Sequence, residues 1–225
     1  MTIAIDFVGT NIGSGTKTYN INFCNELESL DLKEDFIIYF SENYFNQIKF
    51  RQNKNSRIKY IIKSNIFSNI FFRLFWMQLI LPFELKIMGV KKLYSPMNFC
   101  PIFSRLFKIK IILTLHSNLP WVFFHLMPGN IIRNFITKKI MELSISTSNI
   151  LIVASYFAKE EIASILKINK KKTEEIYLGI DKKYLSQECS KNFIKTFNYS
   201  DKYIISVLSC VRYHNILNLL KTFKI

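Results

Sequence analysis

The sequence predicts an α/β protein: a Rossmann-like parallel sheet with helices on both faces. Short apolar runs of strand length alternate with longer segments of helical periodicity over residues 1–181. That alternation is typical of a parallel sheet covered on both sides. The chain has 225 residues, of which 49% are hydrophobic, so it is large enough to bury a sizeable core.

The elements are expected in the following order. Seven runs predict strands: TIAIDFV from Thr2, DFIIYF from Asp35, RIKYIIK from Arg57, KKLYSP from Lys91, KIKIILTLH from Lys108, NILIVAS from Asn149 and TEEIYLG from Thr173. Within residues 9–27 a glycine-rich turn leads into a helical pattern, and further helical patterns occupy residues 66–85, 129–148 and 156–168. The second of these ends near Gly89, a plausible C-cap, and the polar stretch 41–56 is expected to be a loop with a short helix.

A domain boundary is expected after residue 181. Residues 182–200 are polar and weakly patterned, which predicts a linker. The run KYIISVLS from Lys202 then begins a new βα unit within residues 201–225. One strand and one helix cannot bury a core of their own, so we expect this unit to be the truncated start of a second domain.

The amino-acid composition indicates which kinds of partner the protein could bind. The net charge of +15 favours an anionic partner, although a chain rich in Lys, Asn, Ile and Phe also fits biased base composition. Basic residues are spread along the chain and no nucleic-acid-binding motif is present, so no nucleic-acid partner is expected. The cysteines lack metal-ligand spacing, so no metal is expected, and they suit a reducing cytoplasm: Cys24, Cys100, Cys189 and Cys210. The first residues, MTIAIDFVG, have neither a basic n-region nor a long apolar h-region, so no signal peptide is expected.

The aromatic segment from Ile66 to Leu85 is the one stretch that suggests a membrane. Arg73, Gln78 and Pro82 interrupt it, which favours a buried or interfacial helix over a spanning one. Together with the positive charge, it suits peripheral attachment to an anionic membrane surface.

The first candidate site is GTNIGSGTKT, directly after the first strand. Glycines there let the backbone turn tightly and approach a phosphate. Gly9, Gly13 and Gly15 do not have the G-x-G-x-x-G spacing, and Thr16 interrupts the P-loop pattern before Lys17. Two interpretations stay open: a structural turn, or a turn that faces a ligand at the carboxyl edge of the sheet.

Polar residues that follow strands form the other candidate sites. His116 ends the clearest strand, and Asn98 follows a neighbouring one, so both are candidates for the cleft beyond the strand ends. Arg212 and His214 follow the strand of the last unit near a helix start, where cations and free N–H groups suit a phosphate. Each of these residues also has an ordinary structural or surface interpretation.

Several stretches in order resemble the GT-B glycosyltransferases of family 4. RLFWMQLILPFEL resembles the R-x-x-W-x-Q-x-x-LP helix of that family, with Arg73, Trp76, Gln78, Leu81 and Pro82 in place. The other matching stretches are the glycine turn, LYSPMNFCP, IILTLHSNLPW, ILIVASYFAKEEI, IYLGID and SVLSCVRYHNILNLLKTF.

The resemblance implies two Rossmann-like domains that face each other across a cleft. The first binds a glycan or lipid-linked acceptor and the second a nucleotide-sugar donor, and the sugar is transferred with retention of configuration and without a metal or cofactor. It implies that Gly13, Gly15, Arg212 and His214 bind the donor phosphates, and that His116 lies beside the transferred sugar. Asn98 and Ser117 would lie on the acceptor side.

The sequence also departs from the family pattern. Ser117 replaces an Asp, Leu178 an Asn and His214 a Lys, and the E-x7-E segment of the second domain has no counterpart. We therefore expect a truncated glycosyltransferase, located in the cytoplasm or peripherally on the inner face of the membrane. The alternative is an inactive remnant that acts at most as a glycan- or membrane-binding module.

Overall fold

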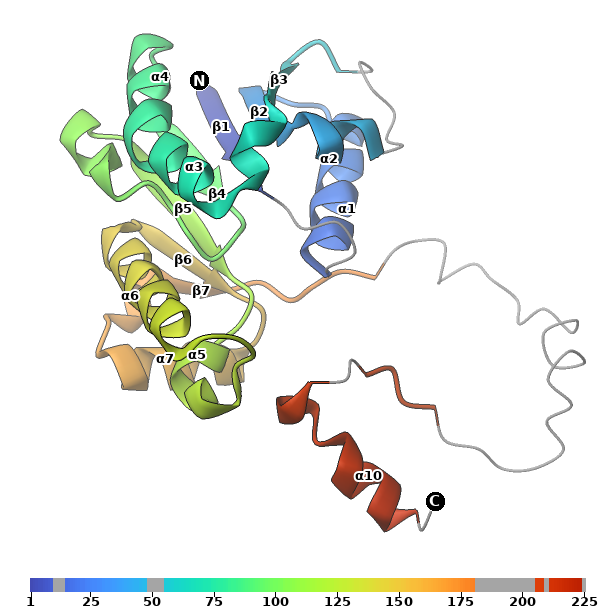
Figure 1. Cartoon of the computed structure of the whole chain (residues 1–225). Coiled ribbons are helices and arrows are strands. Elements are labelled where there is room, and N and C mark those ends of the chain that lie inside the picture. Colours follow the sequence, from blue (N-terminus) through green and yellow to red (C-terminus); the bar gives the residue numbers. More distant parts are fainter. Residues whose placement is uncertain (10–14, 48–54, 181–204, 209–210, 224–225) are drawn as a thin grey trace, which may run out of the picture.

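The apolar runs pair in parallel into one sheet. A computed structural model describes residues 1–9, 15–47, 55–180, 205–208 and 211–223. Its seven strands have the order β3-β2-β1-β4-β5-β6-β7, and every pairing is parallel (Figure 1). The strands are β1 Thr2–Asp6, β2 Asp35–Ser41, β3 Ile58–Lys63, β4 Lys92–Ser95, β5 Lys110–Leu115, β6 Ile150–Val153 and β7 Thr173–Glu175. The predicted Rossmann-like fold is confirmed.

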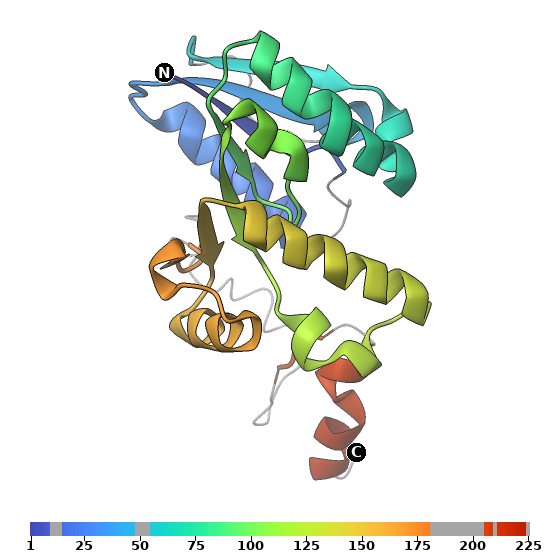
Figure 2. The same cartoon turned by 90° about the vertical axis from the view of Figure 1, so that its left-hand side faces the viewer.

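The strand order places the helices on opposite faces. The chain moves outward from β1 to β3 through α1 (Gly15–Ser29) and α2 (Glu42–Gln47). It then crosses back to β4 and proceeds to β7. The helices of this second series include α3 (Ile70–Phe75), α4 (Leu81–Ile87) and α6 (Ile131–Thr147), and Figures 1 and 2 show these three on one face with α1 on the other.

Strand β5 shows how the two faces differ. Ile111, Leu113 and Leu115 are buried against α6 and α7 (Tyr156–Leu166). Ile112 and Thr114 point to the opposite face, because successive side chains alternate. There α1 and α2 cover the β1–β3 side of the sheet, where Cys24, Leu27 and Tyr44 pack on it.

The aromatic segment 66–85 is helical, as expected, but it is not one uniform α-helix. A 3₁₀ turn (Asn65–Ser68) precedes α3, and a π-helical turn (Trp76–Ile80) joins α3 to α4. Pro82 has no N–H to donate to the carbonyl of Gln78, which disfavours the regular α pattern at this point. The N–H of Leu81 instead reaches the carbonyl of Trp76, five residues back. Gly89 ends the helix with a positive φ, as expected of a C-cap.

The sequence did not predict four short elements. They are α5 (Leu119–Val122) and the 3₁₀ turns Ile102–Phe107, Phe124–Leu126 and Lys170–Lys172. Elements of three to six residues carry too little periodicity to be seen in a sequence. The longer helices have N-cap residues that can be recognised in the sequence. The side chain of Asn130 accepts the N–H of Ile132 in α6, and that of Ser155 accepts the N–H of Ala158 in α7.

The last unit agrees with its prediction only in part. Helix α10 (Ile216–Thr222) is present and follows a 3₁₀ turn, Arg212–His214. Residues 205–208 of the expected strand have no regular structure, so the strand prediction is wrong for them. The remainder of that strand and the expected linker, 182–200, lie outside the described residues. The division into domains stays a prediction.

Candidate functional site

The loop after β1 rests on a buried ion pair. The carboxylate of Asp6 accepts a hydrogen bond from the N–H of Val8 and pairs at 2.5 Å with Arg73 of α3. Gly9 has a φ of +81°, and a Cβ at this position would lie 2.9 Å from Nε of Arg73. Both the backbone conformation and this close approach therefore require glycine. Arg73, conspicuous in the sequence, thus supports the start of the glycine turn.

Gly15 is the first residue of α1, the helix that the glycine turn leads into. A Cβ at Gly15 would meet no atom within 4 Å, so the backbone at this point is open on that side. Gly13 lies outside the described residues.

His116 lies just beyond β5, half-buried, with its backbone and its ring both anchored. Its N–H donates to the side-chain oxygen of Asn98 at 2.7 Å, and its Nε2 lies 2.6 Å from the carbonyl oxygen of Pro96. A carbonyl oxygen only accepts, so Nε2 carries the proton and Nδ1 keeps its lone pair. Burial lowers the pKa of His116, so its ring is neutral at pH 7.

Asn98 has a positive φ of 63°, and its N–H donates to the carbonyl of Thr114. Its side-chain oxygen is already occupied, because it accepts the backbone N–H of His116. The structure therefore brings Asn98 and His116 together, as expected of neighbouring strand ends. Asn98 positions the turn that carries His116.

A chain of hydroxyl groups beside His116 was not expected from the sequence. The hydroxyl oxygens of Tyr19 and Tyr94 are 2.5 Å apart, and that of Tyr94 is 2.9 Å from the hydroxyl of Thr114. The ring of Tyr19 meets the ring of His116 edge to face, with 5.1 Å between centroids. Burial raises the pKa of Tyr94, so its phenol stays protonated. Thr114 lies two residues before His116, and this spacing was a usable signal that both face the same side.

These residues line two adjoining pockets on the α1 face of the sheet. The first, of about 400 Å³, lies over β4, β5 and β6 and includes Tyr94, Thr114 and His116 in its wall. The second, of about 640 Å³, runs along α1 and includes Gly15, Asn22 and Glu26. Both contain Tyr19, Phe23, Leu178 and Gly179. Gly15 and His116, predicted separately, thus line neighbouring spaces.

Four predicted residues are not part of these pocket walls. Asn98 supports His116 through its side chain without lining either pocket. Ser117 is exposed, and its hydroxyl accepts the N–H of Leu119 at the start of α5. Arg212 and His214 belong to the 3₁₀ turn before α10, where the ring of His214 meets that of Tyr213. Among the described residues, Arg212 and His214 therefore do not line either pocket.

The pocket walls are mainly apolar and carry a few hydrogen-bonding groups. The pocket over the strands offers phenol, hydroxyl and imidazole groups beside aromatic rings, and the pocket along α1 adds Asn22 and Glu26, which together suit a ligand with hydroxyl groups and an apolar face. Within the described ranges, no cluster of three or more potential metal ligands is found. Nor is any helix there both long and apolar enough to cross a membrane.

Comparisons with known proteins agree on the fold. The chain matches no family model and no curated protein. Among solved structures it is similar to a glycosyltransferase from Rickettsia africae ESF-5, with 16% identity, a TM-score of 0.52, and coverage of 89% of this chain and 50% of that one. It is also similar to the apo form of the lipopolysaccharide outer core galactosyltransferase WaaB, with 16% identity, a TM-score of 0.47, and coverage of 80% and 46%. The chain spans about half the length of these structures, and the likeness to the Rickettsia glycosyltransferase shows a shared fold.

Proposed function

We propose that this chain is part of a glycosyltransferase of GT-B type that moves a sugar from a nucleotide-sugar donor to a glycan or lipid-linked acceptor. The observation that carries the proposal is the mainly apolar pocket that contains His116, Tyr19, Tyr94 and Thr114 at the carboxyl edge of the sheet, beside the helix that begins with Gly15. The fold shared with a solved glycosyltransferase supports it, as do the sequence motifs. Membership of family 4 and retention of configuration are part of this proposal.

His116 is proposed to orient the sugar. Its ring is fixed by the carbonyl of Pro96, and its Nδ1 is free to accept a hydrogen bond from a sugar hydroxyl. Tyr19, Tyr94 and Thr114 would offer further hydroxyl partners, and the apolar edge of the pocket would receive the C–H face of a ring. His116 needs no proton transfer or covalent bond for this role.

The departing diphosphate needs positive charge and N–H donors. Gly13, Gly15, Arg212 and His214 are proposed to supply them once both halves of the cleft are assembled. In a retaining transfer the acceptor hydroxyl attacks on the face from which the diphosphate leaves. A diphosphate oxygen takes its proton, the bond from sugar to diphosphate breaks, and the bond to the acceptor forms. Asn98 and Ser117 would lie on the acceptor side, and an anionic membrane surface would present a lipid-linked acceptor.

The test is the transfer reaction with His116→Ala. The purified chain is assayed with a panel of nucleoside-diphosphate hexoses, and nucleoside diphosphate release and donor binding are measured separately. We expect turnover to fall about 100-fold, because a misplaced sugar loses its reactive alignment. Donor affinity should change less than about threefold, because the residue acts on orientation.

His125→Ala is the matched control, because His125 is exposed in the 3₁₀ turn after α5 and lines neither pocket. Its turnover should equal that of the unmodified chain. An unchanged rate in His116→Ala would remove His116 from the mechanism. Absence of donor binding and of transfer by the unmodified chain would instead favour a binding module without catalysis.

A further inference from the structure

The face of the sheet opposite the pockets carries an unusual concentration of exposed apolar side chains. Between Ile66 and Met88, ten large apolar residues are exposed, and Phe71 is 78% accessible. The 3₁₀ turn Ile102–Phe107 adds Phe103 and Leu106. Large apolar patches on a monomer mark sites that contact a partner or a membrane.

Helix α6 exposes much of its apolar surface on this face. Its inner side buries Met141 and Ile145 together with the polar residues Asn134, Ser144 and Thr147. Its outer side exposes Ile131, Ile132, Phe135, Ile136 and Leu143. A surface helix normally turns its apolar stripe to the core. The apolar periodicity that predicted this helix therefore belongs largely to its outer side.

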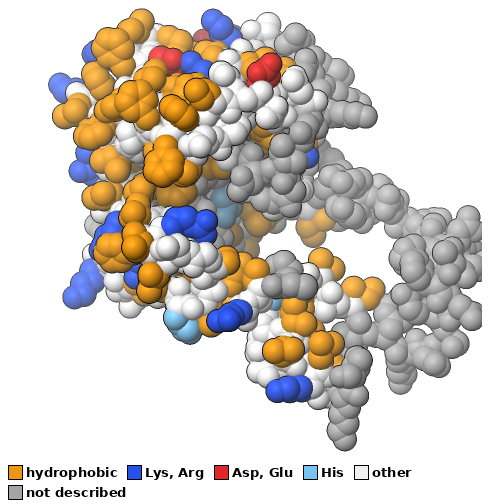
Figure 3. All heavy atoms as spheres, in the orientation of Figure 1, with side chains coloured by type: hydrophobic (Ala, Val, Ile, Leu, Met, Phe, Trp, Pro, Cys, Tyr) orange, Lys and Arg blue, Asp and Glu red, His pale blue; other side chains and the backbone are white. Residues whose placement is uncertain are grey.

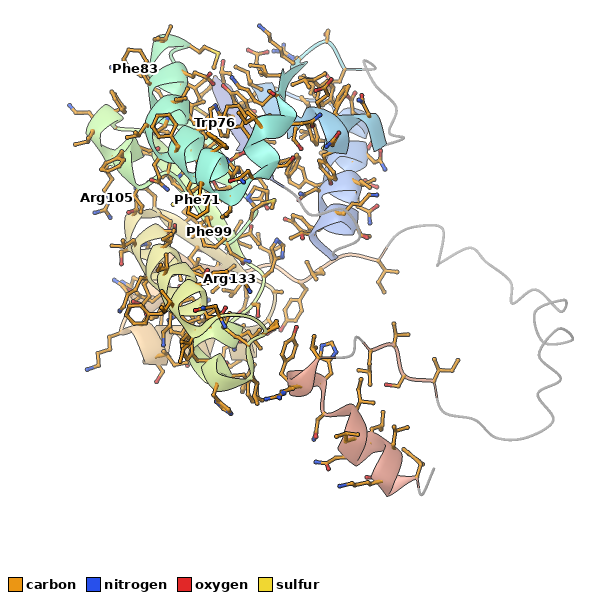
Figure 4. All side chains as sticks on the ribbon, in the orientation of Figure 1. Phe71, Trp76, Phe83, Phe99, Arg105 and Arg133 are labelled. Atoms are coloured by element: carbon orange, nitrogen blue, oxygen red, sulfur yellow. The ribbon has the colours of Figure 1, made fainter. Side chains whose placement is uncertain are left out.

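Figure 2 shows α3, α4 and α6 together on the side that faces the viewer. In Figure 3 hydrophobic side chains gather along the left of the molecule over these helices, with Lys and Arg among them. Figure 4 labels Phe71, Phe83, Arg105 and Arg133 on the same side. We call this surface, formed by residues 65–88, 102–108 and 131–143, the apolar–basic face.

The charge in this part of the chain is strongly one-sided. Residues 65–147 contain ten Lys and Arg but two Asp and Glu, whereas the whole chain has 31 against 16. Both acidic residues are already paired, Glu84 with Lys63 and Glu142 with Lys139. Seven of the ten cations are exposed: Lys86, Lys91, Arg105, Lys108, Lys110, Arg133 and Lys139. A bias in the composition of the whole chain would not by itself concentrate the excess of positive charge in residues 65–147.

We propose that the apolar–basic face docks on an anionic phospholipid bilayer. Phe and Ile side chains would enter the boundary between headgroups and acyl chains, while the surrounding cations meet the phosphates. A second copy of the chain is a poor occupant, because it would bring the same positive charge against this one. This inference extends the proposed function, because it identifies the surface of the chain that would contact the membrane. It depends on the proposed membrane partner but not on sugar transfer.

The experiment is flotation of the full chain with vesicles, compared between matched variants. One set of vesicles is pure phosphatidylcholine, and the other contains about one third phosphatidylglycerol. We expect binding to the anionic vesicles, weaker binding to the neutral ones, and a steep loss as salt rises from 0.1 to 0.5 M. The double variant Phe71→Ser, Ile132→Ser should bind the anionic vesicles about tenfold or more weakly, because it removes inserted apolar area.

Phe157→Ser is the matched control. Phe71 and Phe157 are each the second residue of a helix, α3 and α7, and are 78% and 70% exposed. Phe157 lies outside the apolar–basic face, so its loss should leave binding unchanged. If the first double variant does not fold, Lys86→Glu with Lys108→Glu replaces it, against the exposed control pair Lys33→Glu with Lys221→Glu, which lies outside the apolar–basic face.

Four results would overturn the proposal. The first is failure of the unmodified chain to bind anionic vesicles. The second is equal loss of binding in the test and control variants. The third is a dimer in sedimentation that becomes a monomer in Phe71→Ser, since a second copy would then cover the face. The fourth is vesicle binding that Phe71→Ser, Ile132→Ser leaves intact. Donor release, measured without vesicles, tests sugar transfer separately.

Discussion

At the scale of single residues, Arg73 connects three features. It neutralises the buried carboxylate of Asp6, lies over the ring of Trp76 with 5.0 Å to the ring centroid, and closes the space beside Gly9. A charge this deep is stable only with its partner, because removal of one member leaves the other desolvated and unpaired. The base of the glycine turn therefore depends on a side chain from a different helix.

Replacement of Arg73 with Met should lower the free energy of unfolding by about 3–5 kcal/mol, because the carboxylate of Asp6 would remain buried without a counter-charge. Urea unfolding followed by circular dichroism measures this. Adding Asp6→Asn should recover part of the loss, since the uncompensated charge is then gone.

Arg57→Met is the control, because the Arg57–Asp35 pair is also within hydrogen-bond distance, at 3.1 Å, but lies exposed. An exposed pair contributes about 1 kcal/mol at most, so its loss should be small. Equal destabilisation by the two substitutions would contradict the role given to Arg73.

At the scale of elements, Gln78 of the π-helical turn holds the segment after β4. Its side-chain NH₂ donates to the carbonyl of Cys100 at 3.1 Å, and its oxygen accepts the N–H of Ile102 at 2.7 Å. One amide thus satisfies two backbone groups where the chain leaves Pro101 for a 3₁₀ turn. The same segment begins with Asn98, which supports His116.

Gln78→Leu should destabilise the protein by about 2 kcal/mol, because the N–H of Ile102 loses its partner and the carbonyl of Cys100 keeps only the longer contact from the Ser144 hydroxyl. Thermal unfolding of the variant measures the loss. Leu79→Ala, at the exposed next position, should change stability by less than about 1 kcal/mol. If both variants melt alike, the bridge from Gln78 contributes nothing measurable.

Local sequence patterns predicted the strands and longer helices, but they could not predict contacts between residues far apart in the sequence. The seven strands and the four longer helices follow apolar runs and caps that are visible in the sequence. The contact of Tyr19 with Tyr94 joins residues 75 positions apart, so no local pattern indicates it. The periodicity of α6 identified a helix but not which side faces the core, because exposed and buried apolar residues recur with the same helical spacing. His116 was found because it ends an apolar strand, whereas Ser117 was named by resemblance and lies outside the pocket walls.

At the scale of the whole molecule, the centre of the sheet and the last helix differ in how far they are buried. Strand β5 lies within the sheet, with Ile111 and Leu113 fully buried. Helix α10 has seven residues and buries none of its side chains. An isolated helix shorter than about 12 residues is marginal in water, so α10 needs a partner surface to be stable.

Amide hydrogen exchange should therefore be slowest in Ile111–Leu115 and faster by orders of magnitude in Ile216–Thr222. Exchange followed by mass spectrometry on peptides measures both segments in one experiment. Helix α6, with Met141 and Ile145 in the core, is the internal reference for a helix that is held in place. Protection of α10 equal to that of α6 would show that α10 is packed against something.

The two sides of the sheet have different proposed roles: one contains the pockets and the other would contact a membrane. The apolar–basic face and the pockets lie on opposite sides of the same seven strands. A chain resting on a bilayer through the first side would hold the second toward the aqueous phase. A water-soluble donor would then enter without crossing the headgroups, while an acceptor diffusing in the lipid plane would approach along the rim of the sheet. The thickness of a single sheet would separate the two supply routes.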